Sequence, residues 1–383
     1  MDRFDCLVVA DARFSGGSTT ALATDVTAMS DLGMRIGLLF VRSAYLDDSR
    51  DPPNPKALAL ADLPGVTRLS SGCQAHAKLA FLHHPLVFAR GIEERAKLSA
   101  DRAVMVAHHL PFRPDGSMEY APTEAIRRAR ASLGLSPWIA PVSGLVRAQM
   151  AAFAPLVRQT SEDWPNVFDV ADWRTTRQAF SSAGPITIGR HGRPDTLKFP
   201  ESAEAIDAAL PVGSDIRVRV LGCPNEALAA KGAHPDLWEV QGFGTEPVVA
   251  FLNTLDIFVY HYHPRLQEAF GRTVVEAGLC GRPLLLDPRL KPTFGSMALY
   301  CAPADVRAVV HRIATDKAGA RRRAAEVVER MTALYASESL GPRIEALASD
   351  RGTVSRETGA IPPLRMARKI GGYVRRRLAG HTG

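Results

Sequence analysis

The sequence predicts an α/β protein built from two consecutive parallel-sheet domains. Short apolar runs rich in β-branched residues alternate with longer helical stretches, a pattern typical of parallel strands joined by crossover helices. This alternation stops once near the middle of the chain and then restarts. The length of 383 residues also exceeds the usual ~100–200 residues of a single domain. Together these observations predict two domains, a hinge between them, and a tail.

The first domain is expected to span residues 1–173. Its predicted strands cover residues 6–12, 35–41, 79–84, 103–109 and 138–143. Its predicted helices cover residues 18–32, 87–99 and 123–133. Residues 174–184 lack apolar periodicity, so they are expected to form the hinge.

The second domain, residues 185–350, repeats the pattern. Its predicted strands cover residues 185–190, 217–223, 237–243, 256–263 and 282–288, and its helices cover residues 202–210, 247–255, 273–280 and most of 304–348. In such sheets ligands bind outside the carboxyl ends of the strands, and two such domains place a cleft between them. The strand-to-helix loops are therefore where functional residues are expected.

Residues 351–383 form a basic tail. They contain eight Arg and Lys residues and one Glu, which accounts for the whole net charge of +7 and leaves the remaining chain neutral. A neutral body argues against a nucleic-acid partner. As a helix, residues 364–378 would place Leu364, Ile370 and Leu378 opposite Arg368 and Arg375, which suits an anionic membrane surface. A solvated tail is the alternative.

The compartment is predicted to be cytoplasmic. The five cysteines are scattered and include no Cys-x-x-Cys pair, which argues against a disulfide framework or a structural zinc site. The first apolar run is too short for a signal peptide, and no run approaches the ~20 residues that span a bilayer. Any membrane contact is therefore expected to be peripheral, at the inner face.

The most informative segment is EAFGRTVVEAGLCGRP, which begins at Glu268. It follows a predicted strand, and Gly271 stands where a helix begins. Free amides at a helix start bind anions such as a diphosphate. Glu268 and Glu276 flank this position, and carboxylates accept hydrogen bonds from sugar hydroxyls. The spacing fits a nucleotide-sugar, whereas the alternative is an ordinary amphipathic helix with two exposed acids.

This pattern of two Glu separated by seven residues, with Phe-Gly after the first and Gly-x-Pro after the second, resembles the donor-site signature of the family 4 retaining glycosyltransferases. The resemblance implies the GT-B fold of two Rossmann-like domains. It also implies that Glu276 binds the ribose and Glu268 the transferred sugar. The phosphates would be held by the amides of the segment Phe270, Gly271, Arg272 and Thr273.

The same family resemblance assigns two cations to the donor diphosphate. Gly-Arg ends the strand at 185–190, and a Lys follows, so Arg190 and Lys198 take these roles. Two cations can stabilise a departing diphosphate without a metal ion. The gap to Lys198 is longer than usual in the family, so Arg193 is an alternative. A solvated basic loop is the structural alternative.

Two further features lie in the first domain. Gly16 and Gly17 follow the first strand and resemble the family's glycine loop, which closes over the donor. His108 and His109 end a strand, and the resemblance implies that one of them contacts the transferred sugar. Other histidines at strand ends, His83, His84 and His261, are equally well explained as buried imidazoles. A zinc site at His261 and His263 lacks a third ligand in the sequence.

The sequence thus predicts a retaining transferase that moves a sugar from a nucleotide-sugar to an acceptor hydroxyl of a saccharide or lipid-linked acceptor, in cell-surface polysaccharide or glycolipid synthesis. The predicted catalytic residues are Glu268, His108, His109 and Arg190. The nucleotide-sugar is a substrate, and neither a cofactor nor a metal is expected. The alternatives are a GT-B relative acting as an epimerase or inverting transferase, or a non-catalytic membrane-associated binding protein. A dehydrogenase would need the glycine fingerprint that is missing here.

Overall fold

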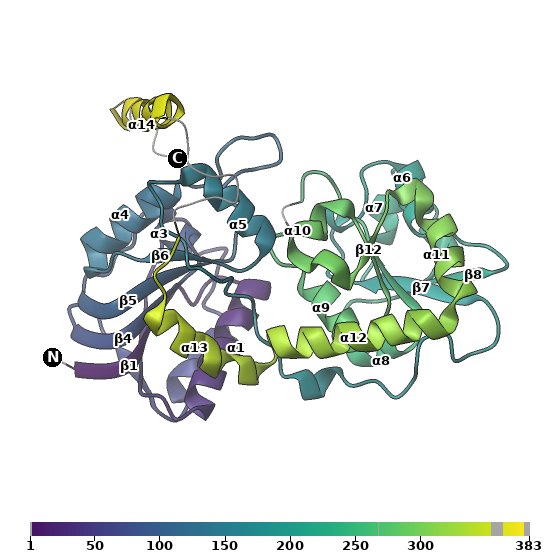
Figure 1. The fold of residues 1–383 in the computed structure, drawn as a ribbon, viewed down its shortest axis with the longest axis horizontal. Coiled ribbons are helices and arrows are strands. Elements are labelled where there is room, and N and C mark those ends of the chain that lie inside the picture. Colours follow the sequence, from purple (N-terminus) through teal and green to yellow (C-terminus); the bar gives the residue numbers. More distant parts are fainter. Residues whose placement is uncertain (1, 267, 354–362, 379–383) are drawn as a thin grey trace. The chain divides into compact units, whose positions relative to one another are not determined.

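The chain forms two compact units, one made of Met1–Val167 with Ser337–Gly383 and the other of Phe168–Ala336. The computed structural model describes residues 2–266, 268–353 and 363–378 (Figure 1). Each unit contains one six-stranded sheet in which all neighbouring strands are parallel. Such sheets need helices on both faces, which explains why the strands β2 (Ile36–Phe40) and β10 (Ile257–Tyr260) are apolar along their whole length.

The first unit has the strand order β3-β2-β1-β4-β5-β6. The strands are β1 (Asp2–Ala10), β2 (Ile36–Phe40), β3 (Val66–Leu69), β4 (Gln74–His83), β5 (Lys97–Ala107) and β6 (Trp138–Pro141). The helices between them are α1 (Gly17–Asp31), α2 (Pro55–Leu58), α3 (Leu86–Ala89), α4 (Pro122–Leu133) and α5 (Gly144–Met150). The second half of β1, from Cys6 to Ala10, is fully buried.

The predicted helix over residues 87–99 is wrong. Helix α3 ends at Ala89, and strand β5 begins at Lys97. The first half of β5 is polar and half-exposed, so its strand character is hidden in the sequence. Strand β3 was not predicted either, because only Leu69 of its four residues is buried.

The second unit has the strand order β12-β11-β10-β7-β8-β9. The strands are β7 (Ile186–His191), β8 (Ile216–Leu221), β9 (Glu239–Gln241), β10 (Ile257–Tyr260), β11 (Leu284–Leu286) and β12 (Leu299–Tyr300). The helices are α6 (Ala203–Ala209), α7 (Asn225–Ala229), α8 (Val248–Asn253), α9 (Arg272–Leu279), α10 (Lys291–Phe294), α11 (Val306–Thr315) and α12 (Lys317–Tyr335). Strand β12 was not predicted, since it consists of two residues at the sheet edge.

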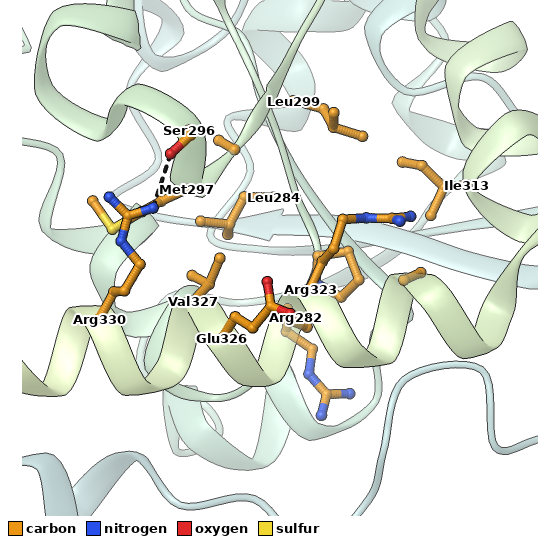
Figure 2. A pocket seen from close by; sticks show the side chains of 14 residues that line it. Arg282, Leu284, Ser296, Met297, Leu299, Ile313, Arg323, Glu326, Val327 and Arg330 are labelled. Atoms are coloured by element: carbon orange, nitrogen blue, oxygen red, sulfur yellow. Dashed lines mark hydrogen bonds between the residues drawn. The ribbon is translucent and has the colours of Figure 1, made fainter.

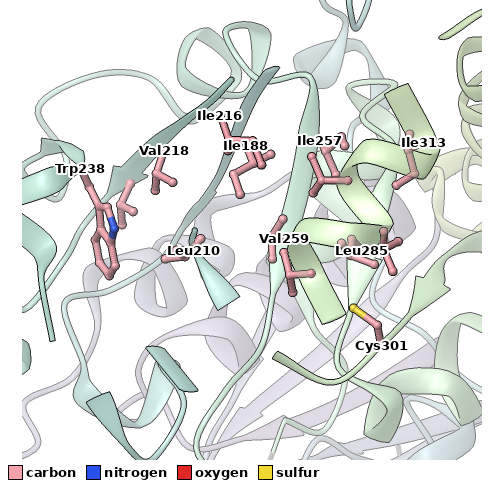
Figure 3. Close-up of a cluster of buried hydrophobic side chains, with 14 of the residues drawn as sticks. Ile188, Leu210, Ile216, Val218, Trp238, Ile257, Val259, Leu285, Cys301 and Ile313 are labelled. Atoms are coloured by element: carbon pink, nitrogen blue, oxygen red, sulfur yellow. The ribbon is translucent and has the colours of Figure 1, made fainter. Parts of the chain in front are cut away.

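Apolar side chains from the central strands form the core of the second unit (Figure 3). Ile188, Ile257 and Leu285 from three adjacent strands lie in one buried cluster with Ile313 of α11. Helix α9 lies close to α12, because Gly278 leaves room for the side chain of Met331. This packing fixes the position of α9, whose first turn follows the carboxyl end of β10.

Two of the expected domain boundaries differ from this division. Helix α13 (Leu340–Ser349), expected in the second domain, belongs to the first unit, where it packs against α1 and β5. Residues 174–184, expected to be a hinge, are bound into the second unit. Arg177 pairs with Asp256 at 2.6 Å, and Phe180 is part of the buried core. Polar anchoring of this kind leaves no apolar periodicity in the sequence.

The tail contains helix α14 (Pro363–Leu378). The side chains of Leu364, Ile370, Val374 and Leu378 are exposed. Most of the predicted linker before it lies outside the described residues. Within the part of the chain that the structure describes, no helix is long and apolar enough to cross a membrane.

Candidate active site

The predicted residues of the second unit gather where its strand order reverses. The chain adds β8 and β9 on one side of β7, then returns to place β10 on the other side. Such a reversal opens a crevice outside the carboxyl ends of the two central strands, the usual ligand position in this architecture. Arg190 and His191 end β7, and Tyr260 ends β10.

Arg190 is a buried cation whose guanidinium has hydrogen-bond acceptors for only some of its N–H groups. Its Nη1 donates to the main-chain oxygen of His261 at 2.7 Å. Its guanidinium lies 4.3 Å from the ring centre of Phe199 and 4.6 Å from that of Tyr260. Its Nη2 is buried without a hydrogen-bond partner among the described residues. Because an unsatisfied buried donor is costly, this N–H is well suited to an anionic ligand.

Lys198, Tyr260 and Glu268 form a hydrogen-bonded triad beside Arg190. The Nζ of Lys198 lies 2.7 Å from Oε2 of Glu268 and 3.0 Å from the Tyr260 hydroxyl, which donates to the same carboxylate at 2.6 Å. Burial alone would raise the pKa of Glu268, but Lys198, Tyr260 and the Gly271 amide together hold it below its ordinary value. Glu268 is therefore an ionised acceptor. Arg193, the alternative to Lys198, is exposed.

The start of α9 presents main-chain amides without a side-chain cap. Gly271 is the N-cap, with φ of 86°, a left-handed conformation that favours glycine. No side chain accepts from the first amides of the helix, so they retain their capacity to bind an anion. The Thr273 hydroxyl nearby is buried without a hydrogen-bond partner among the described residues. Phe270 is buried, with its ring against Tyr335.

Arg272 and Glu276 occupy the first turns of the same helix. The guanidinium of Arg272 lies 4.1 Å from the ring centre of Phe168, and its Nε is 3.9 Å from Oε1 of Glu276. Burial raises the pKa of Glu276 to about 7, although Arg272 opposes this. Glu276 therefore changes its charge near neutral pH.

Sequence reasoning missed His191, which contacts Glu276. Its Nε2 lies 3.3 Å from Oε2 of Glu276, and both side chains are almost fully buried. Burial, reinforced by the charge of Arg190, lowers the pKa of His191 to about 3. The available signal was its place directly after Gly-Arg, at the end of the strand that carries Arg190.

The predicted glycines of the first unit follow β1, at the equivalent reversal between β1 and β4. The loop after β1 leads to Gly16, which has φ of 79° and is the N-cap of α1, and to Gly17, the first residue of that helix. Both glycines are exposed, with open space around Gly16. Phe14 of the same loop stacks on His84, with 4.5 Å between the ring centres.

A cluster of histidines follows β4 and β5. His83 Nδ1 lies 3.3 Å from His108 Nε2, and the ring of His109 stacks on His84 at 6.0 Å. Burial lowers the pKa of His83, His84 and His109, so these rings are neutral near pH 7. His83 and His84 are buried, whereas His108 and His109 are half-exposed. The latter two are therefore the members of the cluster that can reach a ligand.

The zinc alternative receives no support from the geometry. His261 Nε2 contacts the main-chain oxygen of Cys301 at 2.9 Å, and His263 Nδ1 accepts from the Arg265 amide at 2.9 Å. Among the residues that the structure describes, no group of three or more His, Cys, Asp or Glu could hold a metal ion.

A cavity of about 260 Å³ lies elsewhere in the second unit (Figure 2). It is lined by β11, the segment before β12 and helix α12, and none of the predicted site residues borders it. Two of its three arginines are already engaged: Arg282 donates to the main-chain oxygen of Leu255, and Arg330 to the hydroxyl of Ser296. The predicted site residues at the end of β7 and the start of α9 therefore lie away from this cavity.

Comparison with known proteins gives the fold. No protein-family model matches the sequence, and no curated protein matches it. Solved structures do. HepE from Anabaena in complex with UDP and glucose is 14% identical, with a TM-score of 0.60, covering 90% of this chain and 100% of the other. A glycosyltransferase from Rickettsia africae is 12% identical, with a TM-score of 0.58 and coverage of 91% and 98%.

A third structure, described as trehalose-6-phosphate from E. coli bound with UDP-2-fluoro glucose, is 12% identical, with a TM-score of 0.54 and coverage of 91% and 100%. These likenesses extend over nearly the whole length of each chain. They show that the two parallel six-stranded sheets form the GT-B glycosyltransferase fold and confirm the fold class predicted from the sequence.

Proposed function

We propose that the protein is a retaining glycosyltransferase of the family 4 type, which transfers a hexose from a nucleotide-sugar to an acceptor hydroxyl. The observation that carries this proposal is the group of Arg190, Lys198, Glu268 and Glu276 around the start of α9. Two cations, uncapped helix amides and two carboxylates match the parts of a nucleotide-sugar: a diphosphate between two polyols. UDP and glucose in HepE, a protein of the same fold, support this donor class.

In the proposed mechanism, Glu276 accepts hydrogen bonds from the ribose hydroxyls and Glu268 from hydroxyls of the transferred sugar. Arg190, Lys198 and the amides of residues 270–273 hold the diphosphate. As the bond to the sugar breaks, negative charge grows on the leaving oxygen, where these fixed donors stabilise it most. No metal is required for this step.

The acceptor hydroxyl attacks from the face that the diphosphate leaves, and the departing phosphate oxygen takes its proton. This route retains the anomeric configuration without the two placed carboxyl groups of a glycoside hydrolase. His108 or His109 contacts the transferred sugar, and Gly16 and Gly17 form a loop whose bare backbone can approach the donor. The acceptor we propose is a saccharide or a lipid-linked saccharide of the cell surface.

Sugar transfer by purified variants tests this proposal. We expect Arg190→Ala and Glu276→Ala each to lower the transfer rate by at least ~100-fold, the usual effect of removing one such donor or anchor. Arg217→Ala is the matched control, because Arg217 is a half-exposed cation of β8 that pairs with Glu239. Normal transfer by the Arg190 and Glu276 variants would show that the site is misassigned.

A GT-B relative with other chemistry, such as a nucleotide-sugar epimerase or an inverting transferase, would use the same donor site. The anomeric configuration of the isolated product distinguishes these reactions. A non-catalytic binding protein would bind the donor without turning it over.

We further propose that residues 364–378 contact an anionic membrane surface. The support is the combination of exposed apolar side chains, such as Leu364 and Leu378, with six Arg and Lys residues and no acidic residue in the same segment. This contact would bring the enzyme to a lipid-linked acceptor.

A further inference from the structure

His191 and Glu276 are buried side chains in direct contact. The separation of 3.3 Å joins Nε2 of His191 to Oε2 of Glu276, with side-chain exposures of 5% and 12%. Nε2 has no hydrogen-bond partner among the described residues, so its approach to Glu276 is a close contact and not a formed hydrogen bond. The ring also donates to the main chain of Thr273, and since Nε2 faces Glu276, this places that proton on Nδ1.

Below about pH 7, where Glu276 is protonated, one proton lies between the two groups. If Glu276 were ionised and His191 neutral, a lone pair on Nε2 would face a lone pair on Oε2 in a poorly solvated site. One proton removes this conflict, whether it resides on the carboxyl oxygen or on the ring. The low proton affinity of His191 places it on Glu276 in the free protein.

Burial is the main reason for this placement, because it disfavours both the charged ring and the charged carboxylate. Arg190 on β7 and Lys198 further oppose a positive charge on His191, whereas Arg272 on α9 opposes the proton on Glu276. The face toward β10 is the apolar ring of Phe258, and the strand partner on β8 is Leu221. Cys280 at the end of α9 stays a neutral thiol, because burial raises its pKa to about 12.

A bound nucleotide-sugar would reverse two preferences of the free protein: that of His191 for the neutral ring and that of Glu276 for the protonated carboxyl. Its diphosphate would neutralise Arg190 and Lys198, which are the groups that disfavour an imidazolium at His191. Its ribose hydroxyls would donate to Glu276, and a carboxylate accepts two such bonds better than a carboxylic acid does. Both effects drive the proton in the same direction, from the carboxyl oxygen toward the ring.

We propose that His191 is the positioning residue for Glu276, and that one proton moves from the Glu276 carboxyl to Nε2 of His191 when a nucleotide-sugar binds. The O–H bond on Glu276 breaks and an N–H bond on His191 forms, so no proton leaves the pair. The imidazolium then donates to both the Thr273 main chain and Glu276, and it fixes the carboxylate against the ribose. This inference rests on the proposed function.

The test measures binding of UDP-glucose, ADP-glucose and GDP-mannose by calorimetry, because their diphosphate diesters do not titrate near neutral pH. For the nucleotide-sugar that binds most tightly, we expect binding to exchange no net protons with the buffer at about pH 6. At about pH 8.5 we expect binding to take up about one proton. The affinity should be constant below about pH 7 and fall up to tenfold per pH unit above it. Affinity that rises with pH would mean that the proton is expelled, and would overturn the proposal.

Two variants separate positioning from a merely structural role. His191→Gln carries an amide N–H that can donate to Glu276 without titrating, so its affinity should stay constant where that of the wild type falls. His191→Phe should weaken binding at least tenfold at about pH 6. His311→Gln on α11, a half-exposed histidine paired with Asp215, is the control and should keep the wild-type profile. A wild-type profile in His191→Gln would contradict the proposal.

Imidazole NMR of the free wild-type protein provides an independent readout. We expect His191 to remain the neutral ring with its proton on Nδ1 between about pH 5 and pH 8. Its conversion to the imidazolium on donor binding would support the transfer step, and an unchanged neutral ring would refute it. If none of the three nucleotide-sugars binds, the proposed function fails. If one binds without these pH effects, only the role of His191 fails.

Discussion

Lys198 and Glu268 form a buried ion pair that their positions in the sequence do not reveal. They are 70 residues apart, yet Nζ and Oε2 lie 2.7 Å apart because their loops follow the two adjacent central strands. Side-chain exposures of 17% and 14% leave the pair little water. In the proposed reaction Lys198 keeps the Glu268 carboxylate ionised, so that it can accept hydrogen bonds from the sugar.

Removing one member of this pair should destabilise the second unit. We expect Lys198→Met to lower the free energy of unfolding by ~2–4 kcal/mol, because it leaves a carboxylate buried without its cation. The double variant Lys198→Met with Glu268→Gln should recover part of this loss. Urea unfolding measures both, and a neutral effect of Lys198→Met would contradict the pairing.

The lowered pKa of Glu268 predicts that the stability of the folded protein depends on pH. The pKa of Glu268 in the folded protein is below its ordinary value of 4.5. A lowered pKa contributes stability that is complete above the unfolded value and is lost as the pH falls through the folded value. The difference in unfolding free energy between wild type and Glu268→Gln should therefore shrink steadily below about pH 4.5. A difference that stays constant down to about pH 3 would argue against an ionised Glu268.

At the scale of elements, β7 depends on a glycine for its place beside β8. A Cβ at Gly189 would overlap the main-chain oxygen of Arg219 and contact Leu255. The glycine of the Gly-Arg pair thus allows β7 to approach β8 closely and places Arg190 at the carboxyl end of this central strand.

Gly189→Ala should lower the free energy of unfolding by ~3 kcal/mol, the upper end of the usual cost of overpacking, because the backbone of β8 cannot move aside as a side chain can. Gly192→Ala is the matched control, since a Cβ there has nothing within 4 Å. Thermal unfolding compares the two variants. Equal stability of Gly189→Ala and wild type would contradict the tight packing of β7 on β8.

Most elements were predictable where burial makes a strand apolar throughout or a helix periodic. Strands β2, β7 and β8 and helices α1, α4 and α9 follow their predicted ranges to within two residues, whereas the polar starts of β1 and β4 were not predicted. The failures occur where tertiary contacts dominate: the edge strands β3 and β12 and the polar start of β5. Glu268, Glu276, Arg190 and Lys198 could be named from spacing, because motif residues keep their order. The contact of His191 with Glu276 could not, because it depends on the rotation of α9 against β7.

At the scale of the whole molecule, the net charge of +7 belongs to the tail rather than to the body. A basic amphipathic helix gains membrane affinity of ~1 kcal/mol for each basic residue near an anionic surface. The neutral body contributes no such attraction.

We expect the full chain to sediment with vesicles of phosphatidylcholine and phosphatidylglycerol, and the deletion of residues 363–383 to abolish this. Arg368→Gln and Arg375→Gln should each weaken binding by about fivefold, and added salt should weaken it further. Arg217→Gln in the body is the control. Unchanged sedimentation of the deleted protein would remove the membrane proposal and leave the donor site untouched.

The central claim is that the group around the start of α9 binds a nucleotide-sugar, and donor binding to Arg190→Gln tests it most directly. The wild type should bind at least one of UDP-glucose, ADP-glucose and GDP-mannose. Arg190→Gln, which keeps a hydrogen-bonding side chain but removes the charge, should bind it at least ~100-fold more weakly. Equal affinity of the two proteins, or no binding by the wild type, would contradict the account.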